Sequence, residues 1–287
     1  MYQPALGTDA DSLTCAIGQT EVVKFLITQN ASINAIIPDG ATALSQAANY
    51  SQHDVVQILL SHGADASIGD HNGRLPIHNA VTKKSIRCVQ LLLDDDVGIH
   101  TINKLTHAGW FPLMEAAYNG DFELVSLLVE RGAEVNIIAN WGRTPLFCAA
   151  NQGHMEVFNL LFNKCPRVAE MINKVTEWSG TSLLTTAVQG KSLEIVQKLV
   201  ENGADLSKVD YRSRSPLDWA IYQGSADIVQ LLLANGAVVS PKDPVYEGWE
   251  PLHYSCEAGF VDLARMLLAR GADGGSRTGE DGTALHM

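Results

Sequence analysis

Basic residues are scarce in this chain of 287 residues, in which 20 Lys and Arg stand against 32 Asp and Glu, a formal net charge of −12. The Lys and Arg residues also form no stripe along any segment. The phosphate backbone of a nucleic acid would be repelled by such a field. We therefore expect no nucleic-acid ligand, and the charge balance favours a partner with basic or apolar groups.

Cysteines are few, and long apolar runs are missing. No C-x-x-C spacing occurs among the five cysteines, which are Cys15, Cys88, Cys148, Cys165 and Cys256. An odd, unpatterned set of this kind is typical of a reducing compartment. No apolar run approaches 18 residues, so we expect no membrane-spanning helix. No charged segment followed by an apolar one comes after Met1, so we expect no secretion signal. We expect a cytoplasmic, intracellular protein, with a nuclear location left open.

Catalytic signatures are missing too. The sequence contains no nucleophile elbow, no H-E-x-x-H zinc motif, no phosphate-binding loop and no dinucleotide fingerprint. The only acidic run is Asp94–Asp96. A metal site is one interpretation of that run, and a solvated loop or helix end is the one that we prefer. We therefore predict no metal and no cofactor.

What the chain has instead is an internal repeat of about 33 to 37 residues. The segment from Asn140 reads NWGRTPLFCAANQGHMEVFNLLF, and the segments from Asp39 and Arg212 follow the same order. The common template is G-x-T-P-L-x-x-A-A-x-x-G-x-x-x-[IV]-V-x-x-L-L-x-x-G-A. Its first Leu or Ile recurs at Leu44, Ile77, Leu113, Leu146, Leu183, Leu217, Leu252 and Leu285. A fixed period of this size predicts a solenoid of stacked units.

Each template residue has a physical role in a pair of helices. Thr or Ser before the first helix can cap its free N–H groups, as predicted for Thr42, Thr144, Thr181 and Ser215. A Gly can end that helix with a positive φ, as predicted for Gly120, Gly153, Gly190, Gly224 and Gly259. The V-x-x-L-L segment has the 3.6-residue period of an amphipathic second helix. A Gly-Ala pair then ends the second helix. It leads into an extended hairpin segment that connects to the next repeat, which we call a finger.

The template closely resembles the ankyrin repeat, and the resemblance runs from about Asp9 to the end of the chain. It implies an all-α solenoid of antiparallel helix pairs with short β-hairpin fingers. We predict one domain over 1–287, with a degenerate repeat over 1–37, seven repeats over 38–278 and the start of a truncated repeat over 279–287. Whether the chain is a segment of a larger protein is left open. The resemblance also implies structural hydrogen bonds for His78 and His253 in the T-P-L-H position.

Irregular spacings mark insertions, and aromatic residues mark the positions that the template leaves free. The insertions fall around 94–109, 162–180 and 240–248; either they shape a binding surface or they are neutral loops. In the resembling family, finger tips and the outward side of the first helix line a concave face. Our candidate binding residues there are Tyr50, Trp110, Tyr118, Trp141, Arg143, Trp178, Tyr211, Tyr222, Tyr246 and Trp249. Trp and Tyr are frequent binding anchors, although these rings could instead pack finger against finger.

Two functions follow from this pattern. The first is a binding or scaffold protein whose aromatic, carboxylate-edged groove holds a protein or peptide with apolar and basic anchors, or an apolar small molecule. The alternative is an enzyme that binds an apolar small molecule and uses Glu115 and Asp218 for acid–base isomerisation or cyclisation. Burial in an apolar groove would raise the pKa of such carboxyls and permit proton transfer. A solvated helix face is the simpler interpretation of both residues.

Overall fold

The computed structural model describes residues 19–238, 249–279 and 281–287. Over these residues it is all-α, with sixteen α-helices and no strand. None of the helices in the described ranges is long and apolar enough to cross a membrane. Backbone contacts divide the chain into two units, 1–140 and 141–287, which are described in turn. The expectation of one continuous domain stays a prediction.

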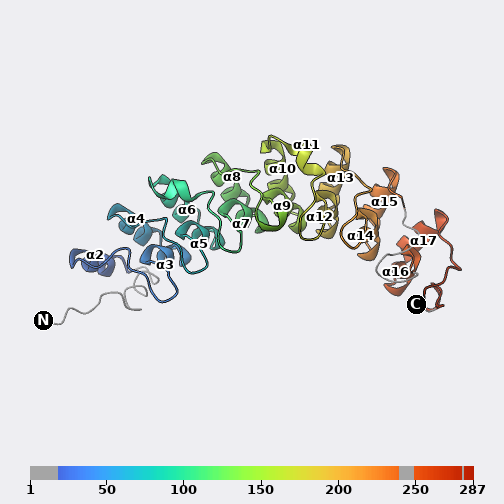
Figure 1. Cartoon of the computed structure of the whole chain (residues 1–287), viewed down its shortest axis with the longest axis horizontal. Coiled ribbons are helices and arrows are strands. Elements are labelled where there is room, and N and C mark those ends of the chain that lie inside the picture. Colours follow the sequence, from blue (N-terminus) through green and yellow to red (C-terminus); the bar gives the residue numbers. More distant parts are fainter. Residues whose placement is uncertain (1–18, 239–248, 280) are drawn as a thin grey trace. The chain divides into compact units, whose positions relative to one another are not determined.

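The first unit consists of helix α2 and three helix pairs. The bounds are α2 Thr20–Thr28, α3 Ala43–Asn49, α4 His53–Ser61, α5 Pro76–Thr82, α6 Ile86–Asp94, α7 Pro112–Tyr118 and α8 Phe122–Glu130. The insertion at 94–109 adds a one-turn 3-10 helix, η1 Gly98–Thr101. In Figure 1 the first helices of these pairs (α3, α5, α7) lie in one row and the second helices (α4, α6, α8) in another.

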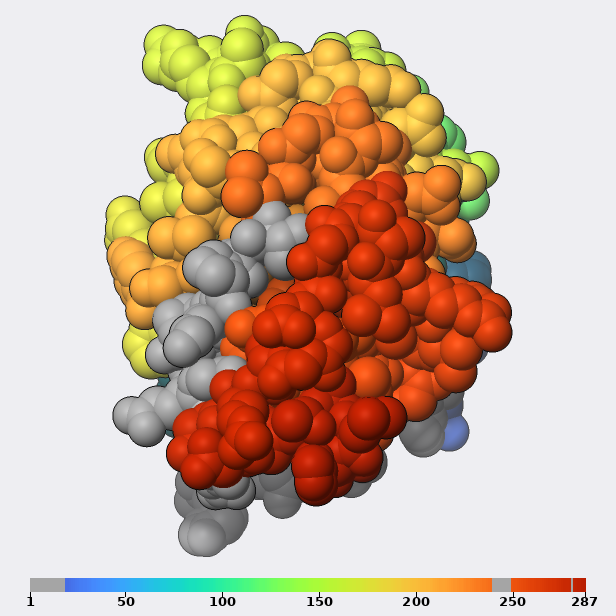
Figure 2. All heavy atoms as spheres, turned by 90° about the vertical axis from the view of Figure 1, so that its right-hand side faces the viewer, coloured from blue at the N-terminus to red at the C-terminus, as the bar shows by residue number. Residues whose placement is uncertain are grey.

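The second unit repeats this arrangement four times. Its helices are α9 Pro145–Gln152, α10 Met155–Lys164, α12 Leu183–Gln189, α13 Leu193–Glu201, α14 Pro216–Tyr222, α15 Ala226–Ala234, α16 Pro251–Glu257 and α17 Val261–Ala269. A turn, η2 Asn140–Gly142, lies at the boundary between the units, and the insertion at 162–180 contains α11 Val168–Ile172. Figure 2 shows the C-terminal repeat (red) seated against the α14–α15 repeat (orange). The third insertion, 240–248, lies outside the described residues.

Each helix pair buries its apolar residues against the neighbouring pairs of its unit. The Ala pairs of the template, such as Ala47–Ala48 and Ala116–Ala117, are fully buried and allow close packing of the first helices. The Leu and Val residues of the second helices, such as Leu128 and Val196, are buried as well. Burial of each such Leu or Val contributes about 1.5–3 kcal/mol, so packing between repeats is the main source of stability.

The predicted caps are confirmed in three repeats and shifted by one residue in the fourth. The hydroxyls of Thr42, Thr144 and Ser215 accept hydrogen bonds from backbone N–H groups of α3, α9 and α14. In α12 the cap is Ser182 and not Thr181, because the helix begins at Leu183. The residue of α12 equivalent to Leu146 is therefore Leu184. The long insertion before α12 hides this shift in the sequence.

Gly190 is needed for a different reason than the sequence suggested. The expected positive φ is present at Gly120, Gly153, Gly224 and Gly259. At Gly190 φ is −74°, and the next residue, Lys191, adopts the left-handed conformation. A Cβ atom on Gly190 would lie 2.4 Å from the carbonyl oxygen of Ala150. This glycine therefore permits close approach of two first helices.

The fingers are turns joined tip to tip rather than long hairpins. Isolated antiparallel bridges, such as Val175 with Ser182, occur at the bases of some fingers. At the tips, the backbone N–H of His107 donates to the carbonyl oxygen of Asn72 at 2.9 Å, and that of Tyr211 donates to Ser179 at 2.9 Å. Each tip thus positions the next one within its unit.

Two buried histidines tie neighbouring repeats together, as the resemblance implied. In His78, Nδ1 accepts a hydrogen bond from the backbone N–H of Leu75 at 3.1 Å, while Nε2 lies 2.9 Å from the carbonyl oxygen of Lys104 in the next repeat. His253 has the same arrangement with Glu250 and Ser276. Burial lowers the pKa of His78 from 6.5 to about 4, against the opposing effect of the Lys104 carbonyl. The neutral ring is therefore the form that the fold requires.

The buried neutral state of His78 predicts acid sensitivity of the first unit. Between pH 6.5 and 4 the unfolded chain binds a proton that the folded chain excludes, so stability is full above pH 6.5 and falls as the pH is lowered. The loss by pH 4 should be about 3 kcal/mol. NMR titration of His78 should give a midpoint near 4, and urea unfolding of His78→Gln should lose this part of the pH dependence. A midpoint near 6.5 would show that the site tolerates the charged ring.

Candidate functional site

The candidate surface lies along the first helices and involves three positions of the repeat. These are the residue just before the N-cap and the fourth and seventh residues of the helix, which lie three apart on the same side. We call this surface the inner face. In the first unit it carries an ion pair between repeats: the Arg74 guanidinium lies 3.4 Å from the Glu115 carboxylate, and the hydroxyl of Thr82 donates to the same carboxylate at 2.6 Å. Arg74 also donates to Asn79 Oδ1 at 3.2 Å.

Two predicted aromatics meet on the inner face of the first unit. The rings of Trp110 and Tyr118 pack edge to face, with 5.5 Å between their centroids. Trp110 is half-buried and Tyr118 is exposed. Tyr50, which follows α3 as its C-cap residue, is exposed but belongs to a different template position. The structure therefore brings Trp110 and Tyr118 together.

The second unit has a larger aromatic cluster on its inner face, formed by Trp219, Tyr222, Trp249 and Tyr254. The ring of Tyr222 packs edge to face against both Trp219 and Tyr254, at centroid distances of 6.0 and 5.8 Å. Trp249 lies 4.9 Å from Tyr254. We call these four residues the inner-face cluster. Neither Trp219 nor Tyr254 is among the binding residues predicted from the sequence, although both occupy the fourth position of a first helix.

A buried arginine and a buried aspartate support this cluster. The Arg214 guanidinium carbon lies 5.3 Å from the Trp219 ring centroid and 4.9 Å from that of Tyr222, within cation–π range. The indole N–H of Trp219 donates to Asp210 Oδ2 at 2.9 Å. Asp210 Oδ1 also accepts the backbone N–H of Arg214 at 3.0 Å. The finger and the first helix are thus joined through charged groups.

Arg143 occupies the position equivalent to Arg214 but remains exposed. The fourth residue of its helix is Cys148, a small and buried thiol. Burial raises the pKa of Cys148 to about 12, with a smaller opposing effect from the Arg143 charge. The thiol therefore stays protonated at neutral pH, and it is the exposed Arg143 side chain that is accessible at this point of the inner face.

Three predicted aromatics lie at the finger tips of the second unit. The exposed fractions are 49% for Trp141, 73% for Trp178 and 69% for Tyr211. The indole rings of Trp141 and Trp178 are 6.2 Å apart and tilted by 58°. The Tyr211 ring packs over Gly180 of the preceding finger, where a Cβ atom would lie 2.6 Å from it. We call these three residues the finger-tip aromatics.

Trp141 has an unusual backbone conformation. Its φ is 64°, followed by 79° at Gly142. A left-handed conformation costs a residue with a Cβ atom about 1–2 kcal/mol, and it is rare for a bulky side chain. The backbone N–H of Glu177 donates to the Trp141 carbonyl at 3.1 Å and holds this turn in place.

The predicted aromatic residues occupy two kinds of template position within their units. Trp110 and Trp249 precede an N-cap and lie on the inner face, whereas Trp141, Trp178 and Tyr211 lie at finger tips. Tyr222 is exposed within the inner-face cluster, and Tyr246 lies outside the described residues. The rings therefore occupy two kinds of position.

The two candidate catalytic carboxylates have structural partners. Glu115 belongs to the ion pair with Arg74 in the first unit. Asp218, in the second unit, closes a capping box on α14: its Oδ2 accepts the backbone N–H of Ser215 at 2.8 Å and the Ser215 hydroxyl at 2.7 Å. Glu115 is the fourth residue of its helix and Asp218 the third, so the two do not share a template position.

The capping role of Asp218 can be separated from a catalytic role. Asp218→Ala should lower the free energy of unfolding by about 1 kcal/mol, because the first turn of α14 loses its carboxylate partner. Asp227→Ala is the matched control, because Asp227 is an exposed acid in the first turn of the next helix. Chemical denaturation measures both changes. If the two substitutions lower the free energy of unfolding equally, the Asp218 carboxylate does not stabilise α14 as a cap.

Comparison with known proteins agrees with this geometry. A model of ankyrin repeats in three copies matches residues 12–103, 96–171 and 168–243, and a model of a single ankyrin repeat matches residues 247–278. The chain is 32% identical over 143 residues to the probable 26S proteasome regulatory subunit p28 of Saccharomyces cerevisiae, over 49% of this chain and 62% of that protein.

Two further relatives show how widely the repeat occurs. The B-cell lymphoma 3 protein homolog of Mus musculus is 31% identical over 166 residues, 57% of this chain and 36% of that protein. The putative ankyrin repeat protein YahD of Escherichia coli is 29% identical over 180 residues, 50% of this chain and 90% of that protein. The chain thus matches less than two thirds of the yeast and mouse proteins. Since the family models match most of its length, the chain belongs to the ankyrin-repeat family, whose members are typically protein-interaction scaffolds.

Proposed function

We propose that this chain is a binding module that holds a protein or peptide segment against the aromatic residues of its second unit. The observation that carries this proposal is the exposure of the finger-tip aromatics, which the fold does not require. Large exposed rings on neighbouring fingers supply contact area with few rotamers to freeze on binding. Single exposed apolar residues are common on protein surfaces, but a contiguous group is typical of an interaction site.

The inner-face cluster adds a preorganised surface below the finger tips. Its four rings contact one another, and Arg214 lies against two of them. Rings held in this way lose little conformational freedom when a ligand binds, which lowers the cost of association. Tyr222 is the ring of this cluster that is exposed, so we assign it the contact with ligand.

The charged groups around these rings define the chemistry of the ligand. Glu177 is exposed beside Trp178, and Glu257 is exposed at the end of α16. These carboxylates and the net charge of −12 favour basic anchors next to apolar ones. Arg143 and Arg212, also exposed, could pair with a carboxylate of the same partner. An apolar small molecule would use the rings but not these charges, so we favour a peptide.

The remaining support comes from the relatives and from the candidate carboxylates. One relative is described as a probable proteasome regulatory subunit, which fits a role as a protein-binding element of a larger assembly. Glu115 and Asp218 both serve the fold, which is why we prefer binding to the acid–base alternative.

Trp178→Ala tests the finger-tip aromatics directly. A peptide that combines Lys or Arg with Leu, selected on the wild-type protein from a display library, serves as the probe. The substitution should weaken its binding by more than about 1 kcal/mol, roughly fivefold, because an exposed anchor is removed without damage to the core. Isothermal titration calorimetry measures the affinity, and thermal denaturation checks the fold.

Phe25→Ala is the matched control for this experiment, because Phe25 is an aromatic residue with an exposed fraction of 61% in the first unit. It should leave the affinity unchanged. If Phe25→Ala and Trp178→Ala weaken binding equally, or if Trp178→Ala has no effect, the finger-tip aromatics are not the binding surface.

Trp141→Gly should separate stability from binding at the strained turn. Gly adopts φ near 64° without steric cost, so the free energy of unfolding should stay the same or rise by up to about 1 kcal/mol. Affinity for the selected peptide should fall, because the ring that contacts Trp178 is lost. Urea denaturation and calorimetry provide the two readings. A clear loss of stability would show that the ring is a structural element of the finger.

A further inference from the structure

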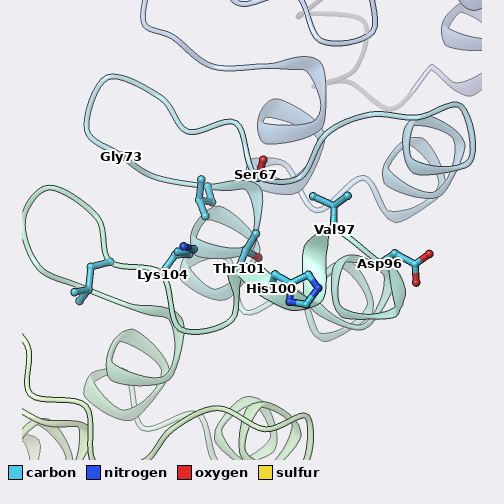
Figure 3. A pocket seen from close by; sticks show the side chains of 9 residues that line it. Ser67, Gly73, Asp96, Val97, His100, Thr101 and Lys104 are labelled. Atoms are coloured by element: carbon cyan, nitrogen blue, oxygen red, sulfur yellow. The ribbon is translucent and has the colours of Figure 1, made fainter.

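A pocket of about 470 Å³ lies in the first unit and is lined by residues of that unit alone. Its walls come from the finger that follows α4 and from the insertion that follows α6 (Figure 3). Leu75, Val97 and Leu105 supply apolar surface. Charged or ionisable side chains around them are those of Asp96, His100 and Lys104. The volume falls within the range of ligand-binding pockets.

The insertion is held in shape by its own hydrogen bonds and by α5. The carboxylate of Asp95 accepts the backbone N–H groups of Val97 and Gly98, at 3.1 and 2.9 Å. The hydroxyl of Thr101 donates to the Gly98 carbonyl at 2.6 Å. At the other end, the Lys104 carbonyl lies 2.9 Å from Nε2 of the buried His78. The pocket wall is therefore a built structure and not a loose loop.

The side chains that could bind a ligand have no partner in the described part of the chain. Of the acidic run, Asp94 pairs with Arg131 at 2.7 Å and Asp95 caps the insertion. Asp96 makes no hydrogen bond or ion pair with the described residues, and the same holds for the side chains of His100 and Lys104. All three are exposed. Figure 3 shows Asp96 and Lys104 on opposite sides of His100.

We propose that this pocket binds a short segment of another protein in which an apolar side chain lies between a basic and an acidic residue. The apolar side chain contacts Val97, Leu75 and Leu105. The basic residue of the segment faces the Asp96 carboxylate, and the acidic residue faces the Lys104 ammonium and His100. The charges of Asp96 and Lys104, which line the same pocket as the apolar side chains, are complementary to such a segment.

A segment of this kind fits the pocket better than a compact apolar molecule. A compact molecule would fill the apolar floor and leave both charged ends without a partner. In an extended peptide, with about 3.3 Å per residue, the middle side chain points to one face and the two flanking side chains to the other. An apolar middle side chain can therefore enter the pocket while the long flanking charged side chains reach the exposed Asp96, His100 and Lys104 from the solvent side. The proposal does not rest on the aromatic surfaces, so either can fail without the other.

The test uses blocked tripeptides and the full chain. Acetyl-Lys-Leu-Glu-amide and its reverse, acetyl-Glu-Leu-Lys-amide, are titrated while the methyl resonances of Val97 and Thr101 are followed by NMR. At least one peptide should shift both resonances with a saturable curve. Asp96→Lys should weaken this binding about threefold or more, as expected for an exposed ion pair replaced by a repulsive one, and should favour acetyl-Glu-Leu-Glu-amide instead.

Three controls make the outcome decisive. Glu123→Lys makes the same charge change at an exposed acid on α8 and should leave the binding of all three peptides unchanged. Trp178→Ala should also leave it unchanged. Octanoate, which is apolar and anionic, should bind at least about threefold more weakly than the better tripeptide. Absent shifts at Val97 and Thr101, equal binding of octanoate, or equal effects of Asp96→Lys and Glu123→Lys would overturn the proposal.

Discussion

A helix pair of this length cannot bury its apolar side chains by itself, and the whole structure depends on the packing of each pair against the next. Ala47, Ala48, Ala116 and Ala117 are buried because neighbouring first helices lie against them. Gly190 contributes to the same packing because it has no Cβ atom, which lets the carbonyl oxygen of Ala150 lie close to it. The residues that pack between repeats therefore recur from one repeat to the next. The residue types on the inner face and at the finger tips vary, because packing does not constrain them.

The same backbone position has been used for different chemistry in different repeats. The residue before the N-cap forms an ion pair in one repeat (Arg74 with Glu115), an edge-to-face ring contact in the next (Trp110 with Tyr118), and a cation–π stack further along (Arg214 with Trp219). The fold fixes the backbone position of this residue but not the type of its side chain. Its chemical type can therefore vary between repeats without a change in core packing. The candidate binding surfaces thus come from positions that packing leaves unconstrained.

Much of the fold could be predicted from the sequence, whereas the site could be predicted only in part. Caps such as Thr42 and glycines such as Gly153 follow from local chemistry. The cap at Ser182 was misplaced by one residue because Thr181 and Ser182 have equal capping ability, and only packing decides between them. The contact of Tyr254 with Tyr222 and the pocket were missed for another reason: they depend on contacts between segments about 30 residues apart, which no single motif reveals.

The contacts between neighbouring repeats also bear on how the chain acquires its structure. Arg74 and Glu115 are separated by 41 residues, and His78 bonds to Lys104 only 26 residues away. Contacts of such short sequence separation lose little loop-closure entropy when they form. Folding can therefore begin at any adjacent pair of repeats and spread in both directions. During synthesis, a repeat would find its packing partner as soon as the next few dozen residues have left the ribosome.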